Sequence, residues 1–328
     1  MDSLGDLLDG PRARGAFLLR AVMEPPWSMR VADQAPLTLV AMTAGEAWYL
    51  PDDSDPVRLV AGDVALIRGP APYTVADEPA TPVQVRIEPD QVCVDVDGVL
   101  VDQSMALGVR TWGNAVDGRT TMLIGTWHVE SEVSRPLLEA LPTFVVRRRG
   151  EWDDALVALL VSETGRDEPG QASVLDRLLD LVLVSVLRSW LPEGAASVGV
   201  AHADPVVGRA LRLIHERPEQ PWSLEGLARA CGSSRAVFAR RFTELVGEPV
   251  IGYLTRWRLA VAADLLAGTD AGLEQVAREV GYGSPYALST AFKRHHGVSP
   301  RDYRRGSGRS VLPSHAPAVV RATAQLPS

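Results

Sequence analysis

Two clusters of basic side chains have the chemistry to bind a polyanion. Their members are Arg235, Arg240, Arg241, Lys293 and Arg294. Each cluster follows a serine, Ser234 or Ser284, and these serines lie 50 positions apart. An arginine can bond a guanine edge or a phosphate at two points, and a lysine pairs with phosphate as a point charge. The clusters therefore indicate contact with nucleic acid, and we expect no catalytic role for them.

The first cluster lies on a helix that we predict over residues 235–246. Ser234 is a favoured N-cap residue, and Gly247 is typical of the position that ends a helix. Helical spacing turns one set of side chains inward: Val237, Phe238, Phe242 and Leu245. It turns another set outward: Arg235, Ala236, Ala239, Arg240 and Thr243. We expect Arg240 to read a guanine edge, and Arg235 and Arg241 to contact phosphates.

The second cluster lies on a helix that we predict over residues 285–295. Ser284 caps this helix and Pro285 takes its first position, where the missing N–H is not needed. The inward side chains are Leu288 and Phe292, and the outward ones are Tyr286, Ser289, Thr290 and Lys293. We expect Lys293 and Arg294 to contact phosphates. The tyrosine and the serine of the outward set either contact thymine methyls or phosphates or remain solvated.

Further helical segments place these two helices in a repeated order. Helices are predicted over residues 205–217, 224–231, 250–266 and 273–280. Gly232 forms a sharp turn before the first basic helix, and residues 281–283 form the turn before the second. The order is that of two helix-turn-helix units joined by a long helix. Such a pair can place two recognition helices in the major groove, about 34 Å apart on one face of the duplex.

This arrangement closely resembles the DNA-binding region of the AraC/XylS family over residues 205–305. The matching segments are residues 223–228, 234–242, 253–259, 276–282, 291–294 and 297–304. The resemblance implies sequence-specific binding to double-stranded promoter DNA and makes RNA polymerase a candidate partner of an activator. The family often has an arginine where this chain has Thr290, which implies weaker base readout by the second helix. The operator, and whether the chain activates or represses, stay open.

The formal charge of the chain is divided along its length. Residues 1–203 hold 16 arginines and 30 acidic residues, a net charge of −14. Residues 204–309 hold 15 arginines, one lysine and 11 acidic residues, a net charge of +5. The total of −8 therefore hides a basic region that can face a polyanion behind an acidic region with another role.

The front of the chain has short apolar runs separated by turn residues, which is typical of short strands, and then a pattern typical of helices. Strands are predicted over residues 38–43, 47–50, 57–60, 64–67, 83–87 and 122–127. Helical spacing begins after residue 135, and residues 192–203 are small and aperiodic. We predict a front domain over residues 1–191, a linker over 192–203, a helix-turn-helix domain over 204–309 and a flexible tail over 310–328. The fold class is α+β, with a β-sandwich or barrel plus helices followed by an all-α domain.

The front domain resembles the cupin-type sensor domain that precedes this DNA-binding module in part of the family. The resemblance depends on residues 62–67, on residues 76–77 and on the order of elements. Residues 1–127 contain no histidine, and Tyr73 stands where a histidine is common, so no metal or other cofactor is predicted. We expect an unidentified small-molecule effector in a pocket with five candidate wall residues: Trp27, Met29, Met42, Trp48 and Tyr73. Ordinary core packing explains the same residues.

Three functions for the front domain stay in competition. The leading one is a regulator that binds an effector and dimerises. The second is a cupin oxygenase or isomerase with an attached DNA-binding module, against which the missing histidines count. The third is a domain that only assembles protomers or binds a partner protein. The sequence does not give the effector's identity.

The remaining features concern assembly, cysteines and location. A predicted helix over residues 174–190 is apolar on more than one face, which indicates either a homodimer seam through Leu178 and Val182 or an intramolecular core. Cys93 and Cys231 leave one bridge possible, and Cys93 is either a redox sensor or a buried thiol. The N-terminus is acidic where a signal peptide would be basic and then apolar, and the longest apolar stretch carries charges. We therefore expect a cytoplasmic protein without membrane contact.

Overall fold

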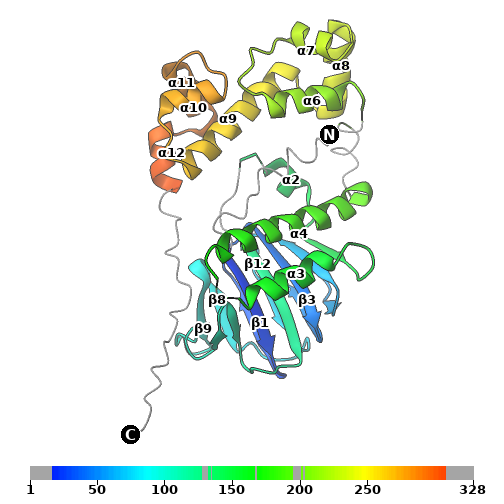
Figure 1. Ribbon diagram of the computed structural model, residues 1–328, viewed down its shortest axis with the longest axis vertical. Helices are drawn as coiled ribbons and strands as arrows, with labels where there is room; N and C mark the ends of the chain where they lie inside the picture. The colour runs from blue at the N-terminus through cyan, green and yellow to red at the C-terminus, as the bar shows by residue number, and fades with distance from the viewer. Residues whose placement is uncertain are drawn as a thin grey trace. The chain divides into compact units, whose positions relative to one another are not determined.

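The computed structural model describes residues 17–127, 132–133, 135–166, 168–194, 201 and 204–307 (Figure 1). The chain forms two compact units. One is rich in sheet and includes residues 13–128 and 142–189. The other is helical and contains residues 204–307. The predicted α+β class with two domains is therefore confirmed.

The sheet-rich unit contains two sheets. Its strands are β1 (Phe17–Met23), β2 (Ser28–Val31), β3 (Leu37–Ala44), β4 (Glu46–Pro51), β5 (Val57–Val60), β6 (Val64–Arg68), β7 (Tyr73–Ala76), β8 (Val85–Glu88), β9 (Val92–Asp95), β10 (Ala106–Gly108), β11 (Thr111–Gly113), β12 (Thr120–Trp127) and β13 (Phe144–Arg147). One sheet has the order β10-β11-β1-β12-β3-β6-β13, and the other has the order β5-β4-β7-β2-β8-β9. Most neighbouring strands are antiparallel, as in a sandwich.

Both faces of the seven-stranded sheet are buried. Val40 and Met42 of β3 belong to the core between the sheets. Leu39, which precedes Val40 in the same strand, is buried but lies outside that core. Two helices, α3 (Ala155–Thr164) and α4 (Gln171–Gly194), lie across the outer face over β1, β12 and β3 (Figure 1). Gly125 of β12 makes room for α4, since a Cβ there would stand 2.6 Å from Leu179 Cδ1. The sheet is thus covered by its partner sheet on one side and by helices on the other.

The proposed dimer seam through α4 is corrected by this packing. Leu178 is only 7% exposed and Val182 is fully buried, because the broad apolar face of α4 covers the domain's own sheet. The intramolecular alternative therefore holds for these two residues. Among the described side chains of α4, the large apolar ones that remain exposed are Val174, at 46%, and Leu181, at 50%.

The helical unit is built around one long helix. Its helices are α6 (Val207–Glu216), α7 (Leu224–Ala230), α8 (Arg235–Val246), α9 (Val250–Gly268), α10 (Leu273–Glu279), α11 (Pro285–His296) and α12 (Pro300–Ser307). The first half of α9 shares a buried core with α6, α7 and α8. Its second half shares another core with α10, α11 and α12. The two predicted helix-turn-helix units and the helix that joins them are confirmed.

One short segment from the front of the sequence belongs to the helical unit. The Asp264 carboxylate of α9 accepts hydrogen bonds from Glu132 N at 2.8 Å and Val133 N at 3.3 Å. Val133 is 7% exposed and belongs to the core around the first half of α9. The predicted boundaries placed all of residues 1–191 in the front domain, whereas the structure groups this segment and α2 (Arg135–Ala140) with the helical unit.

Candidate nucleic-acid interface

The two recognition helices, α8 and α11, begin and end in the same way. At α8 the Ser234 hydroxyl accepts a hydrogen bond from Val237 N at 3.4 Å. At α11 the Ser284 hydroxyl accepts one from Ala287 N at 3.2 Å. Both helices stop at a glycine in the left-handed region, Gly247 with a φ of 86° and Gly297 with a φ of 77°. These caps satisfy end groups that a helix leaves unpaired, as the sequence predicted.

The long helix α9 and the turn of the second helix-turn-helix unit both contact the loop before α7 in the first unit. The Arg258 side chain of α9 donates to Pro218 O at 2.7 Å and to Gln220 O at 2.6 Å, in the loop before α7. Gly281, in the turn before α11, has a φ of 76° and lies against the same loop. A Cβ on it would stand 2.8 Å from Pro218 O and from Glu219 O. The close approach fixes how the two units lie within the helical unit.

The outward face of α8 carries most of the residues that the sequence placed there. The exposed ones are Arg235, Ala236, Arg240, Arg241 and Thr243, and Ala239 is partly buried. Val237, expected inside, is 49% exposed. The helical repeat explains this difference, since Val237 lies about 100° around the helix from Phe238. A helical wheel centred on the two buried phenylalanines would have predicted Val237 as a surface residue.

The arginines of α8 differ in how tightly they are held. Arg240 and Glu244, one turn apart, approach only to 3.7 Å and are 76% and 62% exposed. Such a pair contributes little, so the Arg240 guanidinium can leave it for a stronger partner. Arg241 donates from Nε to Asp204 Oδ2 at 2.8 Å, and Asp204 is 8% exposed. Glu244 was not among the predicted site residues, although its acid lies on the same outward face.

Asp204 connects α8 to the start of α6. Its Oδ1 accepts hydrogen bonds from Val206 N at 3.0 Å and Val207 N at 2.9 Å. Burial alone would raise the pKa of Asp204, but these backbone hydrogen bonds and the Arg241 guanidinium outweigh it and hold the pKa below its ordinary value. The pair with Arg241 is therefore part of the framework of the first unit.

The outward face of α11 has no acidic side chain. Thr290, Lys293 and Arg294 are exposed, Ser289 is partly buried, and Tyr286 is 82% exposed. An exposed aromatic ring of this size is unusual unless it meets a partner. All eleven residues predicted for the interface thus lie on α8 or α11, and each keeps some exposed surface.

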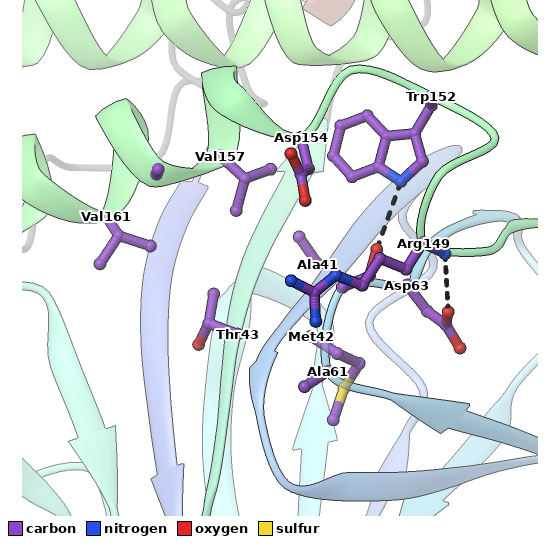
Figure 2. A pocket seen from close by; sticks show the side chains of 12 residues that line it. Ala41, Met42, Thr43, Ala61, Asp63, Arg149, Trp152, Asp154, Val157 and Val161 are labelled. Carbon is purple, nitrogen blue, oxygen red and sulfur yellow. Dashed lines mark hydrogen bonds between the residues drawn. The ribbon is translucent and has the colours of Figure 1, made fainter.

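Four of the five residues proposed to line an effector pocket, Trp27, Met29, Met42 and Tyr73, belong to the core between the sheets. Trp27 is fully buried, Met29 is 2% exposed, and the Tyr73 ring lies 5.3 Å from the Tyr49 ring at a tilt of 48°. Trp48 lies outside that core and is partly exposed. Only Met42 lines a cavity of about 360 Å³, which lies beside α3 (Figure 2).

The cysteines and the titratable residues supply no metal site within the described ranges. Cys93 and Cys231 are free thiols, so the bridge left open by the sequence is absent. Burial, with Asp102 nearby, raises the pKa of Cys93 to about 12. The reactive thiolate is therefore scarce at neutral pH, which favours the buried-thiol alternative. No three His, Cys, Asp or Glu side chains gather as metal ligands among the described residues. Each helix in the same ranges is too short or too polar to span a bilayer.

Two helix-turn-helix units with exposed basic faces define a DNA-binding protein, and comparison with known proteins agrees. A family described as Cupin matches residues 2–192, and one described as Helix-turn-helix domain matches residues 227–306. The HTH-type transcriptional regulator AlkR of Acinetobacter baylyi is 28% identical over 325 residues, which cover 94% of this chain and 100% of AlkR. A protein of Streptomyces lividans named as an AraC-like transcription regulator is 31% identical over 317 residues, which cover 93% of this chain and 98% of that protein.

One solved structure is similar over about a third of this chain. The DNA-binding domain of AdpA, in complex with a target DNA, is 33% identical and covers 33% of this chain and 97% of that domain, with a TM-score of 0.31. The chain belongs to the AraC-like family of DNA-binding transcriptional regulators and carries a cupin domain ahead of its helix-turn-helix domain. The expected resemblance is confirmed, as is the prediction of a regulator in preference to an enzyme, since these relatives are named as transcriptional regulators.

Proposed function

We propose that the chain binds two successive major-groove segments of promoter DNA in the cytoplasm, with α8 as the base reader and α11 as the positioning helix. The observation that carries this proposal is the repeated backbone frame of the two units around one helix, with different side chains outward. Arg240 is exposed and weakly paired, beside the small Ala236, and so has room to reach a base edge. Lys293 and Arg294 on α11 suit phosphates.

Control by a small-molecule effector in the cupin domain completes the proposed function. The segment held by Asp264 supports such control, because it packs in the helical unit while the strands on either side of it in sequence, β12 and β13, belong to the sheet. A shift in those strands would pull on α9, the helix that joins the two helix-turn-helix units. Contact of the DNA-bound form with RNA polymerase, and hence activation, is the further step that the family resemblance favours.

We also propose that the chain acts as a homodimer through the exposed stripe of α4. Val174 and Leu181 are seven residues apart, which places them on one face about two turns apart. Changing both to Glu should give monomers in sedimentation, with the melting temperature kept because neither side chain is buried. An unchanged dimer would exclude this stripe as the seam.

The DNA-binding proposal is tested by selecting operators from random duplexes with the full-length chain and titrating the winner in anisotropy. Affinity should fall steeply with salt through counterion release, by about a hundredfold between 50 and 200 mM if about four phosphates are neutralised. A fragment over residues 204–309 should keep this slope, because both basic faces lie in it. Affinity that is independent of salt, or no preferred sequence, would contradict the proposal.

A further inference from the structure

The cavity beside α3 has a wall that is mostly apolar. Its lining residues come from β3, from the turn between β5 and β6, from the loop after β13 and from α3. Ala41, Val157, Ala158 and Val161 supply apolar surface, and Trp152 closes one side. The Trp152 indole donates to Gly62 O at 3.3 Å, which fixes that wall (Figure 2). At about 360 Å³ the cavity is at the small end of ligand pockets.

The side chain of Asp63 determines which arginine is available at this cavity. Asp63 is 1% exposed and accepts from the Arg148 guanidinium at 2.6 Å, from Val60 N at 3.0 Å and from Arg149 N at 3.3 Å. The charge of Arg148 is therefore used within the fold. Arg149 is held by its backbone alone, which leaves its side chain for another partner.

The Arg149 side chain extends among the lining residues without a carboxylate partner. Figure 2 shows its guanidinium reaching in among them, away from the main-chain bond to Asp63. Gly62 makes this course possible, since a Cβ there would stand 2.8 Å from Arg149 Cγ and Cδ. No carboxylate of the described residues pairs with this guanidinium. An apolar wall thus meets the guanidinium of an exposed arginine.

Asp154 places a negative charge at the same cavity. It precedes α3, and its carboxylate makes no cap hydrogen bond. A second negative charge on a ligand would be repelled there, whereas a single carboxylate can pair with Arg149 and turn its apolar part toward α3. The size and the apolar wall favour a small hydrocarbon group, and the charges of Arg149 and Asp154 favour a ligand with a single carboxylate.

We propose that this cavity is the effector site and that it binds a compact monocarboxylate, with the carboxylate on Arg149 and a small branched or cyclic hydrocarbon group against Val157 and Val161. The proposal rests on the effector control of the proposed function. It differs from the pocket expected between the sheets, because it lies on the outer face of the seven-stranded sheet.

The test is calorimetry on the full-length chain with 3-methylbutanoate and cyclohexanecarboxylate, and with their primary amides as neutral controls. The carboxylates should bind saturably and the amides at least tenfold more weakly. Arg149→Gln should lower carboxylate affinity by about tenfold or more, as the loss of a charged hydrogen bond requires, and Arg149→Lys should restore part of it. Asp154→Asn should raise carboxylate affinity by about two- to fivefold.

A matched control is Arg86→Gln, which removes an exposed arginine of the other sheet and should leave carboxylate binding unchanged. Equal binding of acids and amides, binding that ignores Arg149→Gln and Asp154→Asn, or no binding of either acid would overturn the site. Operator affinity measured with and without the acid tests the regulation separately. Acid binding that leaves operator affinity unchanged would remove the effector role, and acid binding in a chain that binds no DNA would contradict the proposed function while the site stands.

Discussion

The two helix-turn-helix units share a backbone frame but carry different chemistry on it. An offset of 50 residues pairs the capping serines, the terminal glycines and the buried Phe242 and Phe292 of α8 and α11. The same offset pairs Arg240 with Thr290, and Ala236 with Tyr286. Groups that shape the backbone are thus repeated, whereas groups that face outward are not. The frame sets where a side chain can reach, and the side chain sets what it can read.

The outward faces differ in bulk as well as in charge. On α8 the small Ala236 leaves Arg240 clear to approach a base edge, and Glu244 is an acid that can accept from a cytosine amino group. On α11 the ring of Tyr286 stands at the place of that alanine, and the charged side chains of this face are all basic. A close face with charges of both signs suits readout of bases, and a bulky face whose charges are all basic suits phosphates.

The substitution Arg240→Ala should have the largest effect and tests whether α8 reads bases. We expect it to lower operator affinity by about five- to 150-fold, because a two-point contact to guanine contributes about 1–3 kcal/mol. Binding to random duplex should change far less, so the gap between operator and random DNA narrows. Competition titrations in anisotropy measure both affinities.

Arg235→Ala is the matched control, since it removes an exposed arginine from the first turn of the same helix. It should weaken operator and random DNA by one common factor, as loss of a phosphate contact does. If Arg240→Ala also lowers both affinities equally, Arg240 contacts a phosphate and the assignment of α8 as reader fails.

The turns of the two units offer a second, smaller test. Gly232 and Gly281 both have positive φ, at 67° and 76°, but a Cβ on Gly232 would meet nothing within 4 Å. Alanine at either position bears a similar left-handed strain of about 1–2 kcal/mol. Only Gly281→Ala pushes on the loop at Pro218 and displaces the second unit. We expect operator affinity about tenfold lower for Gly281→Ala than for Gly232→Ala, since misplaced contacts are worth about 1–3 kcal/mol each.

Protein unfolding and DNA binding must both be followed in this pair of variants. Similar melting temperatures with different operator affinities would show that Gly281 fixes the spacing of the units. Equal affinities would show that the contact with the α6–α7 loop serves stability alone.

The sequence predicted the helical unit far better than the cavity. Serine caps and glycine stops are local signals, so the predicted bounds of α8 agree residue by residue with the structure. The strand β1 was missed, because its Leu19-Arg20 step breaks the expected alternation, and pairing with β11 on one side and β12 on the other makes it a central strand. Local signals end where tertiary pairing begins.

The three consecutive arginines at the end of β13 show the same limit of local sequence signals, here at the candidate effector site. Arg147 is buried and donates to Ser189 O at 2.8 Å, Arg148 pairs with Asp63, and Arg149 extends into the cavity. Nothing in their order distinguishes them, because each one's role is set by elements distant in sequence. The aromatic residues that the sequence favoured were instead taken up by the core between the sheets.

The smallest expected effect concerns how the two recognition helices are anchored. The place of Arg241 on α8 is taken by Ala291 on α11, so only the first unit has the ion pair with Asp204. Asp204→Asn keeps an oxygen that can cap α6, because Asn and Asp cap equally well, and removes only the charge. We expect it to lower the free energy of unfolding at pH 7 by at most about 1 kcal/mol, since Arg241 remains 47% exposed.

The pH dependence identifies that charge as the cause. The folded pKa of Asp204 is held below its ordinary value of 3.8, so its stabilising contribution is complete well above pH 3.8 and is lost as the pH falls through the lowered folded pKa. The difference in unfolding free energy between wild type and Asp204→Asn should therefore be constant near neutral pH and shrink below about pH 4. Denaturant titrations at several pH values measure it, with Asp270→Asn, an exposed residue before α10, as control. If the difference in unfolding free energy persists unchanged at pH 3, the effect comes from the hydrogen bonds of Asp204 to the start of α6. The ion pair between Asp204 and Arg241 would then contribute nothing to the anchoring of α8.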